Sequence, residues 1–342
     1  MKKMKVILIF LTVLILCCGC GGNQKDKPQE KEETQKKKIG LLFDTYVIPR
    51  WQKDRDVLVS ALKELGVEVN VQNANGDKER QVQQMEYFID QKMDAIAVVA
   101  IDSESLEDEI KKAQAQGIPV LSYDRLVKNG GTDGYISFDN EKVGKLMGEA
   151  MADRLEEGSK ILMICGPLED NNVHYVEKGF LEAIQKKNIQ VLDTTYVTNW
   201  DSDEVEDYLK QNMNLVEQVQ GIMCGNDSLA GQTITTLAQH QLAGKIVVVG
   251  QDADLDACQR IVEGTQYMTV YKPVDELADA AAKLLIEMAQ GENMEEETVL
   301  FDGTYEIPSV FLEPVAVTKE NMDATVIADG FHLKEDVYLN AE

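Results

Sequence analysis

From residue 39 onward, short apolar runs alternate with longer stretches in which apolar residues recur every three or four positions. The short runs have the length and β-branched content of buried strands, and the longer stretches have the period of amphipathic helices. The runs predict strands over 39–43, 67–71, 95–100, 120–122, 135–138, 161–164, 191–197, 221–223, 246–249 and 267–271. The stretches between them predict helices over 51–65, 78–91, 104–116, 141–155, 173–187, 204–212, 229–239, 255–262 and 274–289.

This alternation is typical of parallel sheets covered by helices on both faces, with right-handed crossovers. The pattern runs to residue 138 and then restarts, so we predict an α/β protein made of two similar doubly wound lobes. We expect the first lobe to hold 39–139 and 273–307, because helix 274–289 is placed back on it. The second lobe would hold 140–272 and 308–342. Three strands crossing between the lobes would form a hinge.

Polar side chains follow several of the predicted strands at the point where each strand ends. The loops are Tyr123-Asp124-Arg125, Asp170-Asn171-Asn172, Gly225-Asn226-Asp227 and Gly250-Gln251-Asp252. In parallel α/β sheets, ligands bind outside the carboxyl ends of the strands. We therefore expect these loops to converge on one binding site.

The charge and the N-terminus place limits on partners and location. The chain has 34 Lys and Arg against 60 Asp and Glu, a net charge of −26, which argues against nucleic acid and anionic membrane surfaces as partners.

A basic start and an apolar run over 6–16 predict a signal peptide over 1–20. It ends in Cys17-Cys18-Gly19-Cys20, which resembles a bacterial lipoprotein box. We expect lipidation at Cys20, with Cys18 and an ordinary cleaved signal as alternatives, followed by a disordered charged tether over 21–38.

Eight motifs, in order from residue 39 to the C-terminus, resemble the periplasmic sugar-binding proteins of bacterial ABC importers. The match is to the ribose- and galactose-binding group, and within it to members that bind D-xylose. The motifs lie at 50–56 (RWQKDRD), 73–76 (NANG), 123–125 (YDR), 135–144 (YISFDNEKVG), 170–172 (DNN), 226–227 (ND), 250–255 (GQDADL) and 267–273 (YMTVYKP). The resemblance implies the type I periplasmic binding protein fold. It also implies ligand contact by Arg50, Asp124, Arg125, Asn172, Trp200, Asn226, Asp252 and Lys272.

The sequence departs from the family pattern at two places. The family's Ser before Asn226 is Gly225 here, and the segment around Trp200 matches poorly outside that residue. The other tryptophan, Trp51, also lies in a segment expected to reach the cleft. An indole can cover the C–H face of a sugar, so both tryptophans are candidate contacts, with a place in the core as the alternative for each.

Local roles compete with ligand contact at other positions. Asp252, Asn172 and Asn226 stand where N-cap residues stand. Asp254 is better placed to cap a helix beginning at 255, which favours ligand contact for Asp252. For three further candidates the alternatives are a surface ion pair between Asp124 and Arg125 and an exposed hinge position for Lys272.

The resemblance implies extracytoplasmic binding of D-xylose and its delivery to the transmembrane subunits of an ABC permease. Asp accepts, Arg donates in a fork and Asn does both, so these side chains suit adjacent sugar hydroxyls. Ribose, arabinose or glucose are alternative ligands. A lipid-anchored xylose sensor docking on a histidine kinase ectodomain is an alternative role.

Catalysis is not expected. The sequence has no GxSxG, HExxH or GxxxxGK[ST] motif, and no cofactor or metal is implied. The run over 251–256 lacks the Gly and the distal Glu of a calcium loop. A sugar-responsive repressor of this fold would need an N-terminal DNA-binding head, where this chain has a signal and a charged tether.

Overall fold

A computed structural model describes residues 36–294 and 298–341, which belong to one compact unit, Lys36–Glu342. The predicted signal peptide, Cys20 and tether residues 21–35 lie outside the described residues. The tether end expected at residue 38 is wrong, because strand β1 (Lys38–Phe43) begins at Lys38, which pairs with Glu68. Within the part that is described, none of the helices combines the length and apolarity needed to cross a membrane.

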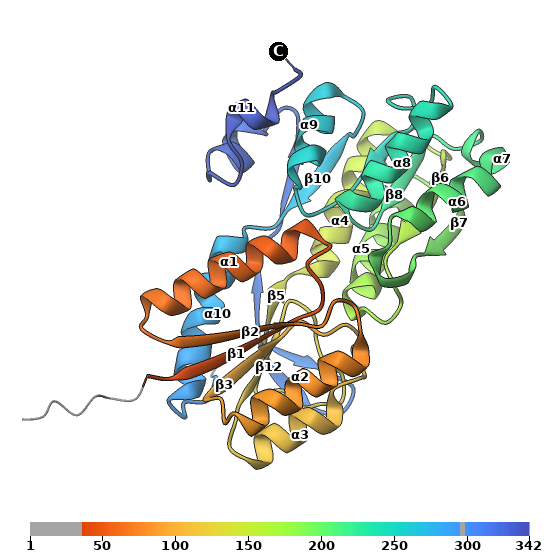
Figure 1. Ribbon diagram of the computed structural model, residues 1–342. Coiled ribbons are helices and arrows are strands. Elements are labelled where there is room, and N and C mark those ends of the chain that lie inside the picture. Colours follow the sequence, from red (N-terminus) through yellow and green to blue (C-terminus); the bar gives the residue numbers. More distant parts are fainter. Residues whose placement is uncertain (1–35, 295–297, 342) are drawn as a thin grey trace, which may run out of the picture. The chain divides into compact units, whose positions relative to one another are not determined.

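The first lobe is built on a seven-stranded sheet in the order β11-β12-β5-β4-β3-β1-β2 (Figure 1). Its strands are β1 (Lys38–Phe43), β2 (Glu68–Asn73), β3 (Ala95–Val98), β4 (Val120–Tyr123), β5 (Gly134–Phe138), β11 (Val299–Phe301) and β12 (Glu306–Leu312). All pair in parallel except β11, which runs antiparallel to β12. The helices are α1 (Pro49–Glu64), α2 (Lys78–Asp90), α3 (Glu107–Ala115) and α10 (Val274–Ala289).

The second lobe has a six-stranded sheet in the order β13-β10-β9-β8-β6-β7. Its strands are β6 (Lys160–Cys165), β7 (Gln190–Tyr196), β8 (Gly221–Cys224), β9 (Val247–Val249), β10 (Met268–Tyr271) and β13 (Val315–Thr318). Only β13 is antiparallel to its neighbour. The helices are α4 (Asn140–Arg154), α5 (Asn171–Gln185), α6 (Asp203–Gln211), α7 (Met213–Val216), α8 (Asp227–Gln239) and α9 (Leu255–Glu263). Short helical turns η1 (Thr198–Trp200) and η2 (Asp323–Ile327) and helix α11 (Lys334–Val337) complete it.

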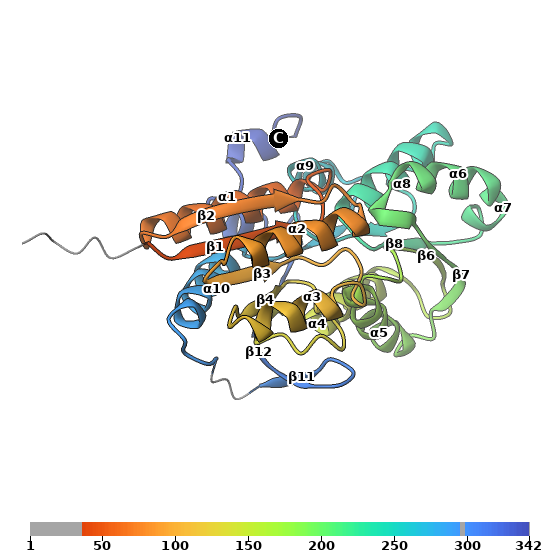
Figure 2. The ribbon, with the colours of Figure 1, turned by 60° about the horizontal axis from the view of Figure 1, so that its bottom comes forward.

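Helices cover both faces of each sheet, as the alternating pattern predicted. Leu58 on α1 and Leu285 on α10 pack in one core on the first sheet, while Phe88 on α2 and Ile110 on α3 pack in another. Two further cores flank the second sheet. Figure 2 shows α10 beside the first sheet. This helix follows the strands of the second lobe in the sequence, and it was predicted to lie on the first lobe.

The chain passes between the lobes three times, after Phe138, after Tyr271 and after Leu312. The third crossing corrects the boundary expected at 307/308. Residues 308–312 belong to β12, which pairs in parallel with β5 of the first sheet. The second lobe is rejoined only after Glu313-Pro314, where β13 begins. The apolar pattern of this tail is compatible with either sheet, so the sequence alone did not distinguish them.

Candidate functional site

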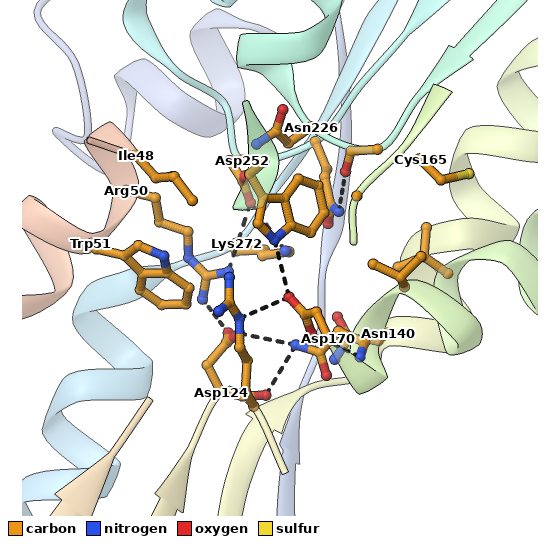
Figure 3. A pocket seen from close by; sticks show the side chains of 18 of the residues that line it. Ile48, Arg50, Trp51, Asp124, Asn140, Cys165, Asp170, Asn226, Asp252 and Lys272 are labelled. Carbon is orange, nitrogen blue, oxygen red and sulfur yellow. Dashed lines mark hydrogen bonds and ion pairs between the residues drawn. The ribbon is translucent and has the colours of Figure 1, made fainter. Parts of the chain in front are cut away.

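The loops that follow the strands of both sheets meet around one cavity between the lobes. The space among their side chains is about 530 Å³ when the opening to solvent is included. All nine predicted ligand residues line it: Arg50, Trp51, Asp124, Arg125, Asn172, Trp200, Asn226, Asp252 and Lys272. Figure 3 shows Arg50 and Asp124 of the first lobe facing Asp252 of the second. The structure brings these residues together, and their contact with a ligand stays a prediction.

Arg50 links carboxylates of both lobes. It lies in the first turn of α1, which Pro49 starts. Its guanidinium forms a short ion pair with Asp124 and lies 3.4 Å from Asp54 Oδ2 and 3.7 Å from Asp252 Oδ1. Burial alone would lower the pKa of Arg50, but these three carboxylates raise it. The side chain is therefore a fixed cation at the centre of the cleft.

Arg125 forms a second bridge between the lobes. Its Nη1 donates to Asp44 Oδ2 at 2.7 Å and to the Ala100 carbonyl at 3.0 Å, and its Nε lies 2.8 Å from Asp170 Oδ2. Asp124 and Arg125 are both buried, and their ion-pair partners are other residues. The alternative of a surface ion pair between them is therefore wrong.

Asp124 adopts a left-handed backbone conformation with φ of 62°, which is costly for a residue other than Gly. Its carbonyl is held by the Tyr135 hydroxyl at 2.9 Å and the Ser137 hydroxyl at 2.7 Å. Asn172 of the second lobe donates to its carboxylate at 3.1 Å. Burial alone would raise the pKa of Asp124, but nearby cations, Arg50 first, lower it. The carboxylate is thus ionised and fixed in direction.

The two asparagines differ in how they reach the cavity. Asn172 gives its amide group to Asp124, and its Oδ1 is buried without a hydrogen-bond partner. The cap of α5 is Asp170, not Asn172. Asn226 does cap α8, because its Oδ1 accepts from the Leu229 amide at 2.9 Å, yet it also lines the cavity. The capping alternative is therefore correct for Asn226 without removing it from the site.

Asp252 stands on a strained turn beside Lys272. Asp252 and Ala253 both have positive φ, 99° and 54°, and the Asp252 amide is held by the Val270 carbonyl at 2.8 Å. Lys272 Nζ donates to Asp252 Oδ1 at 3.0 Å and is only 4% exposed, so the exposed-hinge alternative is wrong. Asp254 occupies the N-cap position of α9 but makes no side-chain capping bond.

Trp51 belongs both to the core and to the cavity wall. It is 3% exposed and packs in the core of the first lobe. The guanidinium carbons of Arg50 and Arg125 lie 4.7 and 5.3 Å from the centroid of its ring, within cation–π range. Its Nε1 is buried without a partner. The place in the core expected as the alternative is therefore confirmed, and contact of the indole with a ligand stays a prediction.

Trp200 lies on the opposite lobe in the turn η1, again with positive φ, 59°. Its Nε1 donates to Asp170 Oδ2 at 3.3 Å. A side chain at Gly166 would overlap the indole, and a Cβ at Gly225 would lie 3.1 Å from Trp200 Cζ3. The Gly at 225, where the family has Ser, therefore leaves room for this ring.

Three acidic residues that pair with the arginines, Asp44, Asp54 and Asp170, were not among the predicted ligand residues, although the loop that carries Asp170 was expected at the site. Asp54 is fully buried, and the Tyr123 hydroxyl donates to its Oδ1 at 2.7 Å. Burial raises the pKa of Asp54 to about 6, although Arg50 opposes this. The four-residue spacing of Arg50 and Asp54 on a helix was a readable signal. The pairing of Asp44 with Arg125, 81 residues away, had none.

The site suits a neutral ligand rich in hydroxyl groups. Each cation of the cavity, namely Arg50, Arg125 and Lys272, is already paired with at least one carboxylate. An anion entering here would meet carboxylates rather than a free positive charge. Among residues 36–294 and 298–341, no group of three or more His, Cys, Asp or Glu is placed to hold a metal ion. The indoles of Trp51 and Trp200 offer apolar surface to the C–H groups of such a ligand.

A family model described as "Periplasmic binding protein domain" matches residues 39–293. The D-xylose-binding periplasmic protein of Haemophilus influenzae is 40% identical over 309 residues, which cover 88% of this chain and 92% of that protein. The protein of the same description from Escherichia coli K12 is 36% identical over 343 residues, which cover 98% of this chain and 100% of that protein.

A solved structure supports the same fold. An ABC transporter solute binding protein from Clostridium phytofermentans, with bound β-D-glucose, superposes with a TM-score of 0.81. The match covers 88% of this chain and 100% of the other at 22% identity. At that identity the likeness speaks for the two-lobed fold alone.

Proposed function

The chain belongs to the periplasmic binding protein family, and we propose that it binds D-xylose in its cleft and delivers it to an ABC sugar importer. The observation that carries this proposal is the charge balance of the cavity, where every cation is paired and two indoles face the space between the pairs. The names of the two relatives above support the choice of a pentose. D-Ribose, L-arabinose and D-glucose are the alternative ligands.

A pentose presents adjacent hydroxyls, each both a donor and an acceptor. Asp124 and Asp252 would accept from them, Arg50 and Arg125 would donate in a fork, and Asn226, whose Oδ1 caps α8, could donate through its amide nitrogen. Binding in the open state and closure of the lobes would then bring both sets of groups onto the sugar. Direct bridges between the lobes, such as Asn172 to Asp124, support this proposal because they place groups of both lobes within hydrogen-bond distance of each other.

Replacing Asp252 by Ala should lower the affinity for D-xylose by about 1–3 kcal/mol, because a hydroxyl and the Lys272 ammonium lose their acceptor. The measurement is titration calorimetry. The matched control is Asp256→Ala, which removes an exposed carboxylate four residues away that pairs with Arg260. Equal affinity in both variants would remove Asp252 from the site.

No catalysis is proposed. Cys165 lines the cavity, but burial raises the pKa of its thiol, the opposite of what an activated nucleophile needs. The pairing of each cation with a carboxylate likewise leaves no free electrophilic group. The geometry supports holding a ligand and not transforming it.

A sensor that docks on a histidine kinase ectodomain is the second candidate role, because the same cavity would serve it. The two roles differ in the partner that the closed protein binds. A pull-down from membranes with the sugar-loaded protein separates them: recovery of permease transmembrane subunits supports transport, and recovery of the kinase in their place overturns it.

We further propose that Cys20 carries a lipid that anchors the protein on the outer side of the cell membrane, with the residues between Cys20 and β1 as a tether. Cys20→Ser should then release the protein from the membrane fraction and abolish incorporation of labelled palmitate. Cys258→Ser, which changes a buried cysteine of the second lobe, is the control and should stay membrane-bound. Identical fractionation of the two variants would contradict the anchor.

A further inference from the structure

Phe331 and His332, in the turn between η2 and α11, touch both lobes outside the cavity. The Phe331 carbonyl accepts from Lys53 Nζ at 3.0 Å, and the same ammonium lies 3.5 Å from the centroid of the Phe331 ring. Lys53 belongs to α1 of the first lobe, whereas Phe331 packs with the second. His332 Nε2 lies 2.8 Å from the Ala253 carbonyl, so the imidazole donates there.

The residues that Phe331 and His332 contact lie next to, or one helical turn from, three residues of the cavity. Ala253 follows Asp252 in the strained turn, where both residues have positive φ. Tyr271, whose ring centroid lies 4.9 Å from that of Phe331, precedes Lys272. Lys53 lies one helical turn after Arg50. The C-terminal segment therefore touches the backbone that carries the site, from the side away from the cavity. Figure 1 shows this segment, in dark blue, next to α9.

We propose that Phe331 and His332 are positioning residues that clasp α1 to the turn at 252–253 when the lobes close, and thereby slow the release of the sugar. The clasp has two parts. His332 holds the strained turn in the second lobe, and Lys53 joins it from the first lobe. It rests on the proposed sugar binding but makes no contact with the sugar.

The energetic reason is that the Lys53 contact joins the two lobes, so the clasp requires that this contact breaks when they separate. An ammonium on an aromatic face and a hydrogen bond to a carbonyl each favour the arrangement that contains them. A contact present in the closed state and absent from the open state shifts the equilibrium toward closure. Since sugar leaves through the open state, the contact lowers the dissociation rate more than it changes the association rate.

The charges around His332 give the clasp a pH dependence. Burial lowers the pKa of His332, Lys53 lowers it further, and the Ala253 carbonyl, Asp336 and Asp256 raise it. Withdrawal of Lys53 in the open state would let the pKa return toward its ordinary value of about 6.5. The closed state then binds fewer protons than the open state. Affinity therefore falls as the pH drops through this range and is fully present above it.

The test is stopped-flow dissociation of D-xylose from the full chain, followed by tryptophan fluorescence. Lys53→Ala should release the sugar about 5- to 30-fold faster with little change in association. Lys63→Ala, an exposed lysine farther along α1, is the control and should match the wild type. His332→Ala should also release D-xylose faster than the wild type. His332→Gln can still donate to the Ala253 carbonyl, so its dissociation rate should lie close to that of the wild type.

The pH readout compares the wild type with His332→Gln between pH 5 and 8. The wild type should lose more affinity on acidification, while the Asp54 carboxyl, with its pKa of about 6, titrates in both proteins and cancels. Wild-type dissociation rates in both Lys53→Ala and His332→Ala would overturn the clasp while leaving sugar binding intact. A wild type that binds no sugar would overturn the proposed function, and the clasp with it.

Discussion

Replacing Arg50 by Met should lower the affinity for D-xylose by about 10²- to 10³-fold. The change leaves Asp124, Asp54 and Asp252 without their shared cation. Truncating one member of a buried, hydrogen-bonded charge pair costs binding about 2–5 kcal/mol, and the sugar loses a forked donor at the same time. Arg50→Lys should recover only part of the loss, because an ammonium cannot reproduce the planar fork.

The control for this prediction lies five residues along the same helix. Arg55 pairs with Asp56 at the surface, so Arg55→Met removes an equal charge from α1 without touching the cavity. Titration calorimetry on the two variants, with thermal unfolding as a check that both are folded, measures the difference. Comparable affinities in Arg50→Met and Arg55→Met would show that the arginine does not act on the ligand.

Gly179→Ala should lower the free energy of unfolding by about 3 kcal/mol or more. Helices α4 and α5 approach through this glycine, where an added Cβ would overlap the Glu141 carbonyl and lie 2.9 Å from the Lys145 amide nitrogen. Gly144 makes the reciprocal approach, since its Cβ would overlap the Val176 carbonyl. All of these atoms are backbone, so no side-chain rotation relieves the overlap and the helices must separate.

Urea denaturation provides the measurement, and Gly231→Ala on α8 provides the matched control. The three atoms nearest to a Cβ there belong to the guanidinium of Arg260, the closest at 3.0 Å, and they are the end of a long side chain rather than backbone. Gly to Ala within a helix then stabilises by up to about 1 kcal/mol. A Gly179→Ala protein as stable as the wild type would mean that α4 and α5 are packed less closely than the structure has them.

Much of the fold could be predicted because each of the predicted apolar runs forms one strand and each stretch with a 3.6-residue period forms one helix. The site was predicted where its residues follow strands directly, as Asp124 and Asp252 do. The two carboxylates that pair with Arg125 were not among the predicted ligand residues. The Asp44 to Arg125 bond depends on the distance between two loops, which no local pattern encodes. The same holds for Phe331 and His332, whose partners lie 278 and 79 residues away.

The boundary at residue 308 failed for a related reason. A short apolar segment such as β12 can extend either sheet, and its place is decided by pairing with β5. The conformation of Trp200 is also a tertiary effect. Its positive φ is supported by the bond to Asp170 and by the space over Gly166, which lie in another loop.

The central claim is that the cleft binds D-xylose. Titration calorimetry with D-xylose, D-ribose, L-arabinose, D-glucose and D-galactose, with tryptophan fluorescence in parallel, tests it most directly. We expect D-xylose to bind with a dissociation constant of about 1 μM or lower, tighter than the other four, and with a change in indole emission. Absence of binding to all five sugars would contradict the account and withdraw Arg50, Asp124, Arg125, Asn172, Asn226 and Asp252 as ligand residues.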